Sequence, residues 1–233
     1  MHQSYGMADL HLHTNYSSDG STTVPELLAR AAALNLQVVA VTDHDTIAGA
    51  REAQRLADSY GVEVIVGEEV TTRDGHVLAL FIEEQLPPGR PFTETIAAVR
   101  DQGGLVIAPH PFGLFVSSLG LVGWSQQQRH PAWGQLVDAI EVFNAGLWRS
   151  QSNTLATQFA TTHGIPMVGG SDSHHLATVG MGFTRFPGRT AADLRRAILA
   201  GQTSAGGTMW GVWRIAEAGA LWAQRSLSAV RPA

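Results

Sequence analysis

Short apolar segments alternate with amphipathic segments along most of this chain. The apolar segments are rich in branched residues and too short for buried helices, so we predict that they form β-strands. They lie at 8–12, 37–42, 62–66, 77–82, 105–108, 139–143 and 166–168. The segments between them carry apolar residues at helical spacing, which predicts helices. These helices are expected at 25–34, 47–60, 92–102, 151–163 and 191–200.

Residues that favour helix ends lie at the limits of several predicted helices. Pro25 suits the first turn of its helix, and Gly61, Gly103 and Gly164 follow helical segments, where glycine is a common cap. The alternation of strands and helices is typical of a largely parallel α/β sheet. About seven strands in one domain favour a TIM-like β/α barrel. An open, doubly wound sheet is the alternative.

The composition narrows the chemistry that the chain can perform. It has 233 residues, which fits one large domain, and it has no cysteine. All 15 basic residues are arginine, so the sequence excludes disulfides, thiolate metal ligands and nucleophilic cysteine or lysine. The formal net charge is −5, which provides no general attraction for duplex nucleic acid. The 10 histidines are therefore the first candidates for chemistry.

No targeting or membrane signal is recognisable in the sequence. Residues 1–6 are polar and lack the basic start and apolar run of a secretory leader. The long uncharged stretch at 103–128 is interrupted by Pro109 and Pro111, which argues against a membrane span. We therefore expect a cytoplasmic protein that does not bind membranes.

The domain organisation predicted from these patterns is a barrel domain at 1–208 followed by a tail at 209–233. The tail has a helical pattern and carries Trp210, Trp213 and Trp222. We expect its apolar face to pack on the barrel. Binding to a partner, or self-association through this face, is the alternative.

Metal-binding side chains follow or begin most of the predicted strands. The carboxyl ends of parallel barrel strands meet on one face, so residues far apart in sequence can converge there. His11 and His13 lie on the same side of an extended strand, where both can bind one cation. Histidine and carboxylate ligands without sulfur suit zinc, manganese or iron. The other members of this series are Asp43, His44, Glu68, Glu69, His76, His110, Asp172 and His174.

The order of these residues resembles the motif series of the PHP family, named for polymerase and histidinol phosphatase. The resemblance extends from residue 8 to about residue 201. The matching motifs are Asp9-Leu10-His11-Leu12-His13-Thr14 with Ser18-Asp19-Gly20, Thr42-Asp43-His44-Asp45, Gly67-Glu68-Glu69-Val70, Gly75-His76-Val77-Leu78, Ala108-Pro109-His110-Pro111 and Gly169-Gly170-Ser171-Asp172-Ser173-His174. Together they imply the PHP fold, a distorted seven-stranded barrel that holds two or three divalent ions.

The resemblance also implies a ligand set. One ion would be bound by His11, His13, Glu69 and Asp172, and a second by Glu69, His76 and His110. A third would be bound by Asp19, His44 and His174. Asp43 would not bind metal itself but would orient a histidine that does. Glu69 takes the bridging position in this alignment, and Glu68 is the alternative if the alignment is displaced by one residue.

The activity implied by the resemblance is metal-dependent hydrolysis of a phosphoester by a hydroxide that bridges the metals. Glu69, Asp172 and His174 would be the ligands most directly tied to catalysis. The expected substrate is a phosphomonoester or phosphodiester: a nucleotide, a short oligonucleotide or a small phosphorylated metabolite. Candidate substrate contacts are Asn144 and Arg149, near the end of the strand at 139–143, and Arg185.

Two other functions are compatible with the same residues. Amidohydrolase barrels, which hydrolyse C–N bonds, also begin with a His-x-His pair, but Asp19 and the Asp172-x-His174 pair favour phosphoester chemistry. The second alternative is a metal-stabilised scaffold without catalysis, which presents the tail to a partner. In that case deletion of the tail would abolish the biological role and substitution of Glu69 would not.

Overall fold

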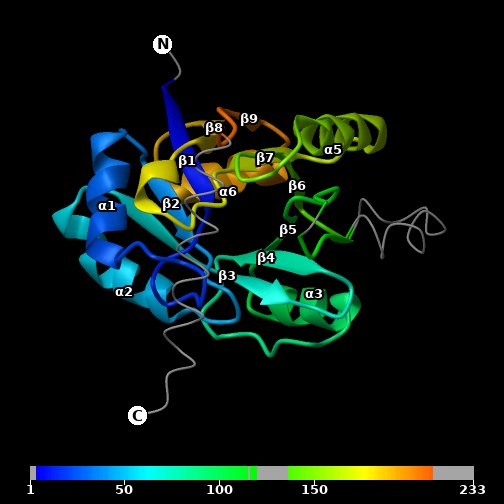
Figure 1. Ribbon diagram of the computed structural model, residues 1–233, viewed down its shortest axis with the longest axis horizontal. Helices are drawn as coiled ribbons and strands as arrows, with labels where there is room; N and C mark the ends of the chain where they lie inside the picture. The colour runs from blue at the N-terminus through cyan, green and yellow to red at the C-terminus, as the bar shows by residue number, and fades with distance from the viewer. Residues whose placement is uncertain (1–3, 115, 120–135, 212–233) are drawn as a thin grey trace.

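The computed structural model describes residues 4–114, 116–119 and 136–211 of the chain. Nine strands form one sheet, and the main helices surround it (Figure 1). The strands are β1 (Tyr5–Leu12), β2 (Val38–Val41), β3 (Glu63–Thr71), β4 (His76–Leu80), β5 (Leu105–Ala108), β6 (Ala139–Asn144), β7 (Met167–Gly170), β8 (Gly182–Pro187) and β9 (Ser204–Gly207). The helices are α1 (Val24–Ala33), α2 (Ala48–Leu56), α3 (Phe92–Asp101), α5 (Ser150–His163) and α6 (Ala191–Leu199). Two short 3-10 helices, η1 (Ala57–Ser59) and η3 (Leu176–Thr178), complete the described elements.

The five helices predicted between residues 25 and 200 are all present, and their ends are close to the predicted ones. Thr23 caps α1 through a capping box with Glu26. Gly164 ends α5 with a φ of 65°, in the left-handed region where glycine has no steric penalty. The predicted helix at 47–60 continues past α2 into η1.

The seven predicted strands are also present, but the structure adds β8 and β9. In β8, the polar residues Thr184 and Arg185 interrupt the apolar pattern, and β9 consists of small residues with weak strand preference. Strand β3 runs beyond the predicted end at residue 66 because Glu68 and Glu69 continue the strand inside the protein. The barrel therefore has more strands than the sequence predicted.

The sheet order is β7-β6-β5-β4-β3-β2-β1-β8-β9. The prediction of a largely parallel sheet is wrong, because half of the strand pairs are antiparallel: β1–β8, β3–β4, β4–β5 and β8–β9. Strands β3 and β4 are joined by a short turn, and a turn of that length can only connect antiparallel strands. This reversal places the first residue of β4 next to the carboxyl end of β3, where the functional side chains lie.

The sheet curls until β1 lies beside β7, which gives the nearly closed α/β barrel that the sequence predicted. Beyond β7, the N–H of His13 donates to the Ser173 carbonyl at 2.8 Å, and the Ser173 N–H donates to the His11 carbonyl at 3.3 Å. Gly170 permits this approach, since a Cβ there would lie 2.6 Å from the Cβ of His11. Closure at this point brings the first and last metal-binding motifs together.

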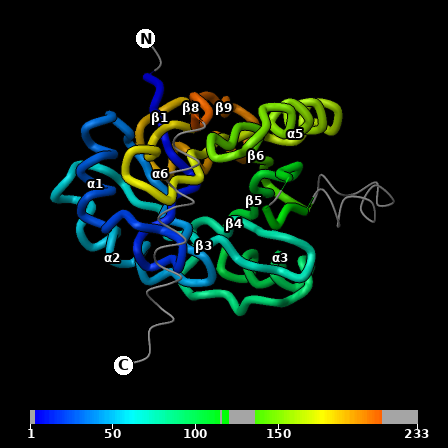
Figure 2. The backbone as a smooth tube through the Cα atoms, viewed as in Figure 1, coloured from blue at the N-terminus to red at the C-terminus, as the bar shows by residue number. Residues whose placement is uncertain are grey.

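Helices cover the outside of the barrel. Figure 2 shows α1 and α2 together at the left of the view, α3 at the lower right and α5 at the upper right. Helix α1 buries an apolar face, which consists of Val24, Leu27, Leu28 and Ala31. Helix α2 packs against β2 and β3, α3 against β4 and β5, α5 against β6, and α6 against β8. This packing of helices on strands forms the hydrophobic core.

The predicted tail is described only at its start. Residues 209–211 belong to the described part of the chain, whereas residues 212–233 lie outside it. The predicted tail helix therefore stays a prediction. Among the helices that the structure describes, none combines the length and the apolar character needed to cross a membrane.

Candidate metal centre

The histidines and carboxylates of the motif series converge at one end of the barrel. His11 belongs to β1 and His13 follows it, His44 follows β2, and Glu69 lies in β3. His110 follows β5, and Asp172 and His174 follow β7. His76 reaches the same end because it begins β4, which runs antiparallel to β3. Asp19 lies in the loop between β1 and α1.

Glu69 lies at the middle of this cluster and is fully buried. Its Oε2 atom is 3.1 Å from Nε2 of His11 and 3.2 Å from Nε2 of His13. Its Oε1 atom is 2.8 Å from Nδ1 of His76 and 3.0 Å from Nε2 of His110. The two oxygens therefore face two different groups of histidines, which is the geometry of a bridging carboxylate.

Asp172 completes the first of these groups. Its Oδ1 atom is 3.3 Å from Nε2 of His11 and 3.3 Å from Nε2 of His13. The ligand atoms of His11, His13, Glu69 and Asp172 all lie within 4.8 Å of one another, and all four residues are buried. This is the first ligand set that the sequence predicted.

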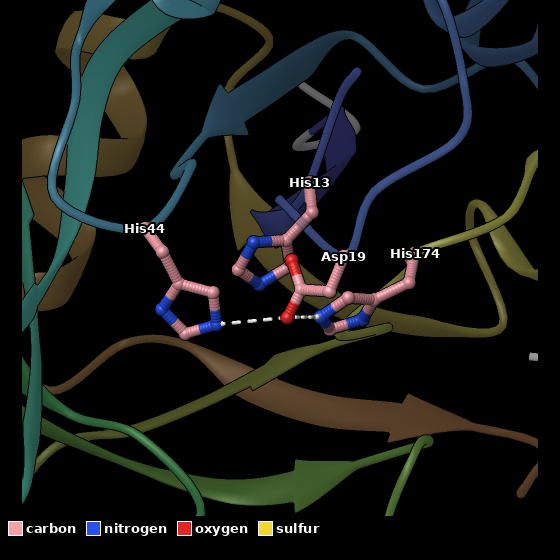
Figure 3. A group of neighbouring side chains, drawn as sticks. All are labelled: His13, Asp19, His44 and His174. Atoms are coloured by element: carbon pink, nitrogen blue, oxygen red, sulfur yellow. Dashed lines mark ion pairs between the residues drawn. The ribbon is translucent and has the colours of Figure 1, made fainter. Parts of the chain in front are cut away.

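Figure 3 shows a second group of side chains, formed by His13, Asp19, His44 and His174. Three of these four residues are only partly buried, so this group lies nearer to solvent than the first. Oδ2 of Asp19 is 3.4 Å from Nε2 of His44 and 3.2 Å from Nε2 of His174. His13 belongs to this group as well, so it is shared with the first. The predicted set of Asp19, His44 and His174 is therefore brought together, with His13 added.

A third group consists of His44, Glu69 and His76. The predicted set was Glu69, His76 and His110, and His110 also reaches the same oxygen of Glu69. His44 thus lies between the two predicted sets, with Nδ1 at 3.5 Å from Oε2 of Glu69. Glu68 points away from the cluster, where its Oε2 accepts a hydrogen bond from the Leu86 N–H at 2.9 Å.

The charges of the cluster stabilise one another. Burial alone would raise the pKa of Glu69, but the histidines around it, first His11 and then His44, hold that pKa well below its usual value. Asp172 is affected in the same way by His11 and His13, and its pKa is also well below the usual value. Both carboxylates are therefore ionised at neutral pH, as metal ligands must be.

The opposite shift occurs in the histidines. Burial alone would lower the pKa of His11, but Asp172 and Glu69 raise it well above 6.5. The pKa of His44 is raised as well, against its desolvation, by Glu69 and Asp19. Without another cation, these histidines take up protons to balance the carboxylates. Metal ions would replace those protons.

The side chains fit divalent metal ions on two grounds. The buried Nε2 atom of His13 makes no hydrogen bond within the described part of the chain, although carboxylate oxygens surround it. A cation shared by these atoms would satisfy the nitrogen lone pair and the carboxylates together. The ligand atoms are nitrogen and oxygen only, which suits zinc, manganese or iron.

Two of the ligand residues adopt a backbone conformation that is unfavourable for side chains other than glycine. The φ angle is 28° at His110 and 53° at Asp172. Such strain persists only where the surrounding structure enforces it, and it is frequent at functional sites. At both positions it turns the chain at a strand end so that the side chain faces the cluster.

Glu141 is a functional residue that the sequence analysis missed. It lies in β6, is buried, and places Oε1 3.1 Å from Nδ1 of His11. Its Oε2 accepts hydrogen bonds from the backbone N–H of His110 at 2.8 Å and from Nδ2 of Asn144 at 2.9 Å. By holding Nδ1 of His11, Glu141 directs Nε2 toward Glu69. The only sequence signal was a glutamate inside an apolar strand segment.

Replacing Glu141 with glutamine is expected to weaken metal binding by about 10- to 100-fold while the protein still folds. The carboxylate faces three donors, and the amide group of glutamine would place a donor against one of them. The measurement is metal content after dialysis against graded chelator concentrations. Unchanged metal affinity would show that Glu141 does not position His11.

Asn144 lies in the cluster, but its side chain is already engaged. Its Nδ2 donates to Oδ2 of Asp172 at 3.0 Å as well as to Glu141. It is fully buried. The expectation of a direct substrate contact is therefore corrected: Asn144 fixes Asp172 so that Oδ1 faces the histidines.

The expectation for Asp43 is also corrected. Its two carboxylate oxygens accept hydrogen bonds from the N–H of Thr14 at 2.6 Å and from the hydroxyl of Thr14 at 2.8 Å. No hydrogen bond to a histidine ring is found for it among the described residues. Asp43 therefore fixes the turn after His13 through the backbone and does not hold a ligand ring.

The two arginines proposed as phosphate contacts differ in position. Arg149 is exposed at the N-cap of α5, after the end of β6 that carries Asn144, and stays a candidate. Arg185 pairs with Met7 near the amino end of β1, and its guanidinium lies 4.8 Å from the ring centre of Tyr5. The prediction for Arg185 is wrong, because the amino end of β1 is opposite to the end that carries His11.

Family models match two parts of the chain. The model of the PHP domain matches residues 9–116, and that of the PHP-associated region matches residues 150–203. These two ranges contain all the predicted ligands.

Relatives were found among both uncharacterized and characterized proteins. MJ1587 of Methanocaldococcus jannaschii, an uncharacterized protein, is 38% identical over 148 residues, which are 59% of this chain and 81% of that protein. A 5'-3' exoribonuclease of Haemophilus influenzae is 36% identical over 103 residues, 42% of this chain and 37% of the enzyme. A phosphoribosyl 1,2-cyclic phosphate 1,2-diphosphodiesterase of Eggerthella lenta is 40% identical over 85 residues, 34% of this chain and 32% of the enzyme.

The fold has a solved counterpart. A two-domain protein of Bacteroides vulgatus with a PHP-like phosphoesterase domain superposes with a TM-score of 0.72 at 20% sequence identity. The match covers 96% of this chain and 70% of that protein. The nearly closed barrel is therefore a fold that occurs in a solved protein.

Proposed function

The chain belongs to the PHP family, and from this premise we propose that it is a metal-dependent phosphoric ester hydrolase with a trinuclear centre. The observation that supports this proposal is the sharing of ligands among three groups. Glu69 and His13 each belong to two groups, and so does His44. Ligands shared in this way hold ions close enough to act on one substrate group.

The charge of such a centre favours an anionic substrate. Its carboxylates are Asp19, Glu69 and Asp172, and all three have pKa values below the usual value. Three divalent ions would exceed the charge of three carboxylates. The surplus positive charge would attract a phosphate group, whose oxygens can contact several ions at once.

The ions, when bound, would bring a water molecule to its nucleophilic form near neutral pH and stabilise the negative charge that develops on the phosphate. This explains how a chain without cysteine or lysine could hydrolyse a phosphoester. The surrounding residues of the protein would hold the ligand side chains in position. Glu141 and Asn144 hold His11 and Asp172, and Asp43 holds the turn after His13.

The substrate class is supported by two relatives of known activity. One acts as an exoribonuclease and the other on a cyclic phosphate of ribose, and the chain spans about a third of the length of each. The second is a diphosphodiesterase by name, and an exoribonuclease breaks the phosphodiester bonds of RNA. We therefore propose a nucleotide, a short oligonucleotide or a small phosphorylated metabolite as the substrate, with zinc, manganese or iron as the metal.

A panel of substrates tests this proposal. Protein purified without chelator is expected to hydrolyse p-nitrophenyl phosphate or its bis-ester, nucleoside monophosphates, or short oligonucleotides, and to lose this activity with chelator. Simple amides and cyclic imides serve as the comparison, because an amidohydrolase would act on them instead. Turnover of amides without turnover of any phosphoester would overturn the proposal.

A further inference from the structure

The segment that follows β9 contacts the metal end of the barrel. The Thr208 N–H donates to the Met181 carbonyl at 2.7 Å, and the Trp210 N–H donates to the Ala145 carbonyl at 2.8 Å. Between them, Met209 accepts a hydrogen bond on Sδ from Nδ2 of Asn153 at 3.2 Å. These contacts fix the start of the predicted tail against the loop between β6 and α5.

This anchoring places the indole of Trp210 beside the ligand residues. Its ring centre is 6.4 Å from that of His174, and the two planes are nearly perpendicular at 79°. Gly146 is also close to the indole, since a Cβ at this position would lie 3.3 Å from Cζ2 of Trp210 and 3.4 Å from Cβ of Asp172. Trp210 therefore borders the part of the centre that is formed by Asp172 and His174.

The polar atom of the indole has no hydrogen-bond partner among the residues that the structure describes. Nε1 of Trp210 is buried and makes no hydrogen bond within the described part of the chain. A buried donor of this kind usually finds an acceptor, because leaving it unpaired is unfavourable. An acceptor on a ligand beside the metal centre would satisfy it.

We propose that Trp210 forms a wall of the substrate site and selects phosphoesters that carry a planar ring, such as a nucleobase. The proposal rests on the proposed function, since it places the substrate phosphate at the metal centre. A phosphate held there would bring the rest of the substrate to the rim of the centre, where Trp210 lies. Indole rings stack well on bases and do so without strict sequence preference.

A purely structural role for Trp210 has different consequences. If its ring only holds the imidazole of His174 in place, its removal would disturb the metal centre itself. Every phosphoester would then be affected equally, whether or not it carries a ring, and metal content would fall. The two roles can therefore be separated with a matched pair of ligands.

The test compares adenosine 5'-monophosphate with ribose 5-phosphate. Both carry the phosphate on the primary 5-hydroxyl of a ribose, and only the nucleotide carries a base. Both are measured on the metal-loaded full chain, as substrates through KM or as inhibitors of the panel substrate through Ki. In Trp210→Ala we expect the constant for the nucleotide to rise about 5- to 100-fold. The constant for ribose 5-phosphate and the metal content should stay unchanged. Trp210→Phe, which keeps a ring, should retain most of the affinity.

Tyr5→Ala is the matched control, because Tyr5 is an exposed aromatic residue at the amino end of β1. It should leave both constants unchanged. An equal loss for both ligands in Trp210→Ala, or a loss of metal, would overturn the proposal. So would an unchanged constant for the nucleotide.

A failure of the proposed function can be distinguished from a failure of the proposed role of Trp210. If the wild-type protein turns over no phosphoester in the panel, that function fails, and the same two ligands are then compared by equilibrium dialysis. A preference for the nucleotide that Trp210→Ala removes would still support the role of Trp210. Equal binding of both ligands by the wild-type protein would contradict it.

Discussion

Replacement of Glu69 with glutamine is expected to lower the rate of phosphoester hydrolysis by at least about a thousand-fold. The carboxylate of Glu69 faces two histidine groups with its two oxygens, at distances of 2.8 to 3.2 Å. Glutamine keeps the shape but removes the negative charge and turns one oxygen into a hydrogen-bond donor. Steady-state rates and metal content of the purified variant provide the measurement.

Glu68→Gln is the matched control for this experiment. Successive residues of a strand point to opposite faces, so Glu68 faces away from the cluster although it is equally buried. Burial raises the pKa of Glu68 to about 7, and its contact with the Leu86 N–H can be kept by a glutamine oxygen. Hydrolysis and metal content should stay close to wild type. If hydrolysis and metal content were instead lost in Glu68→Gln and kept in Glu69→Gln, Glu68 would be the bridging ligand.

Removal of bound metal is expected to lower the melting temperature by about 5 to 10 °C. Ions bound at about a hundred times their dissociation constant stabilise the folded state by about 2.7 kcal/mol, and a chain of this size responds by a few degrees per kcal/mol. The measurement is thermal unfolding with and without chelator, together with elemental analysis. We expect two to three transition-metal ions per chain before chelation.

The size of this shift should depend on pH. In the metal-free protein the pKa values of His11 and His44 are raised by the carboxylates around them. Their stabilising effect is complete below the unfolded pKa of about 6.5 and is lost as the pH rises through the folded pKa. Metal binding, in contrast, strengthens as these histidines lose protons. The difference in melting temperature between loaded and metal-free protein should therefore widen from pH 6 to pH 8.

The thermal unfolding experiment has two controls. One is the return of metal to the chelated protein, and the other is the Glu69→Gln variant. Manganese, zinc or iron should restore both the melting temperature and the hydrolysis, and calcium should not, because the ligand set is rich in histidine. The chelator should shift the variant less than the wild type. A wild-type protein that carries no metal even after reconstitution, and is indifferent to chelator, would show that the histidines are held by their own ion pairs.

The local features of the fold were accessible from the sequence because they depend on near neighbours. The periodicity of apolar residues predicted the five helices and seven of the nine strands. Strands β8 and β9 were missed because their residues do not alternate clearly. These two strands depend on tertiary pairing, because β8 pairs with β1 and β9 pairs with β8. The antiparallel direction of β4 was missed for a related reason, since direction depends on the turn and on the partner strands.

The side chains of the candidate metal centre were predicted more completely than the residues that support them. The spacing of His11 and His13 and the ordered motifs pointed to the ligands directly, since each motif is local. Glu141 and Asn144 carry no such signal. Their hydrogen bonds connect β6 to His11 and to Asp172, across separations in sequence that periodicity cannot reach. The prediction for Arg185 was wrong because Arg185 follows the Asp172 motif in sequence, whereas in the barrel it lies near the amino end of β1, away from the candidate metal centre.

The sequence by itself determined the element pattern, the absence of thiol and amine chemistry, and a set of nitrogen and oxygen ligands for metal ions. The family resemblance grouped these side chains, but only the tertiary structure showed that His13 and His44 also belong to two groups each. The curled sheet and the antiparallel β4 bring Glu69 between His11 and His76. The tertiary structure also placed Trp210 next to His174. The physical reason is that apolar periodicity is set by local burial, whereas distances within the centre are set by how the strands close into a barrel.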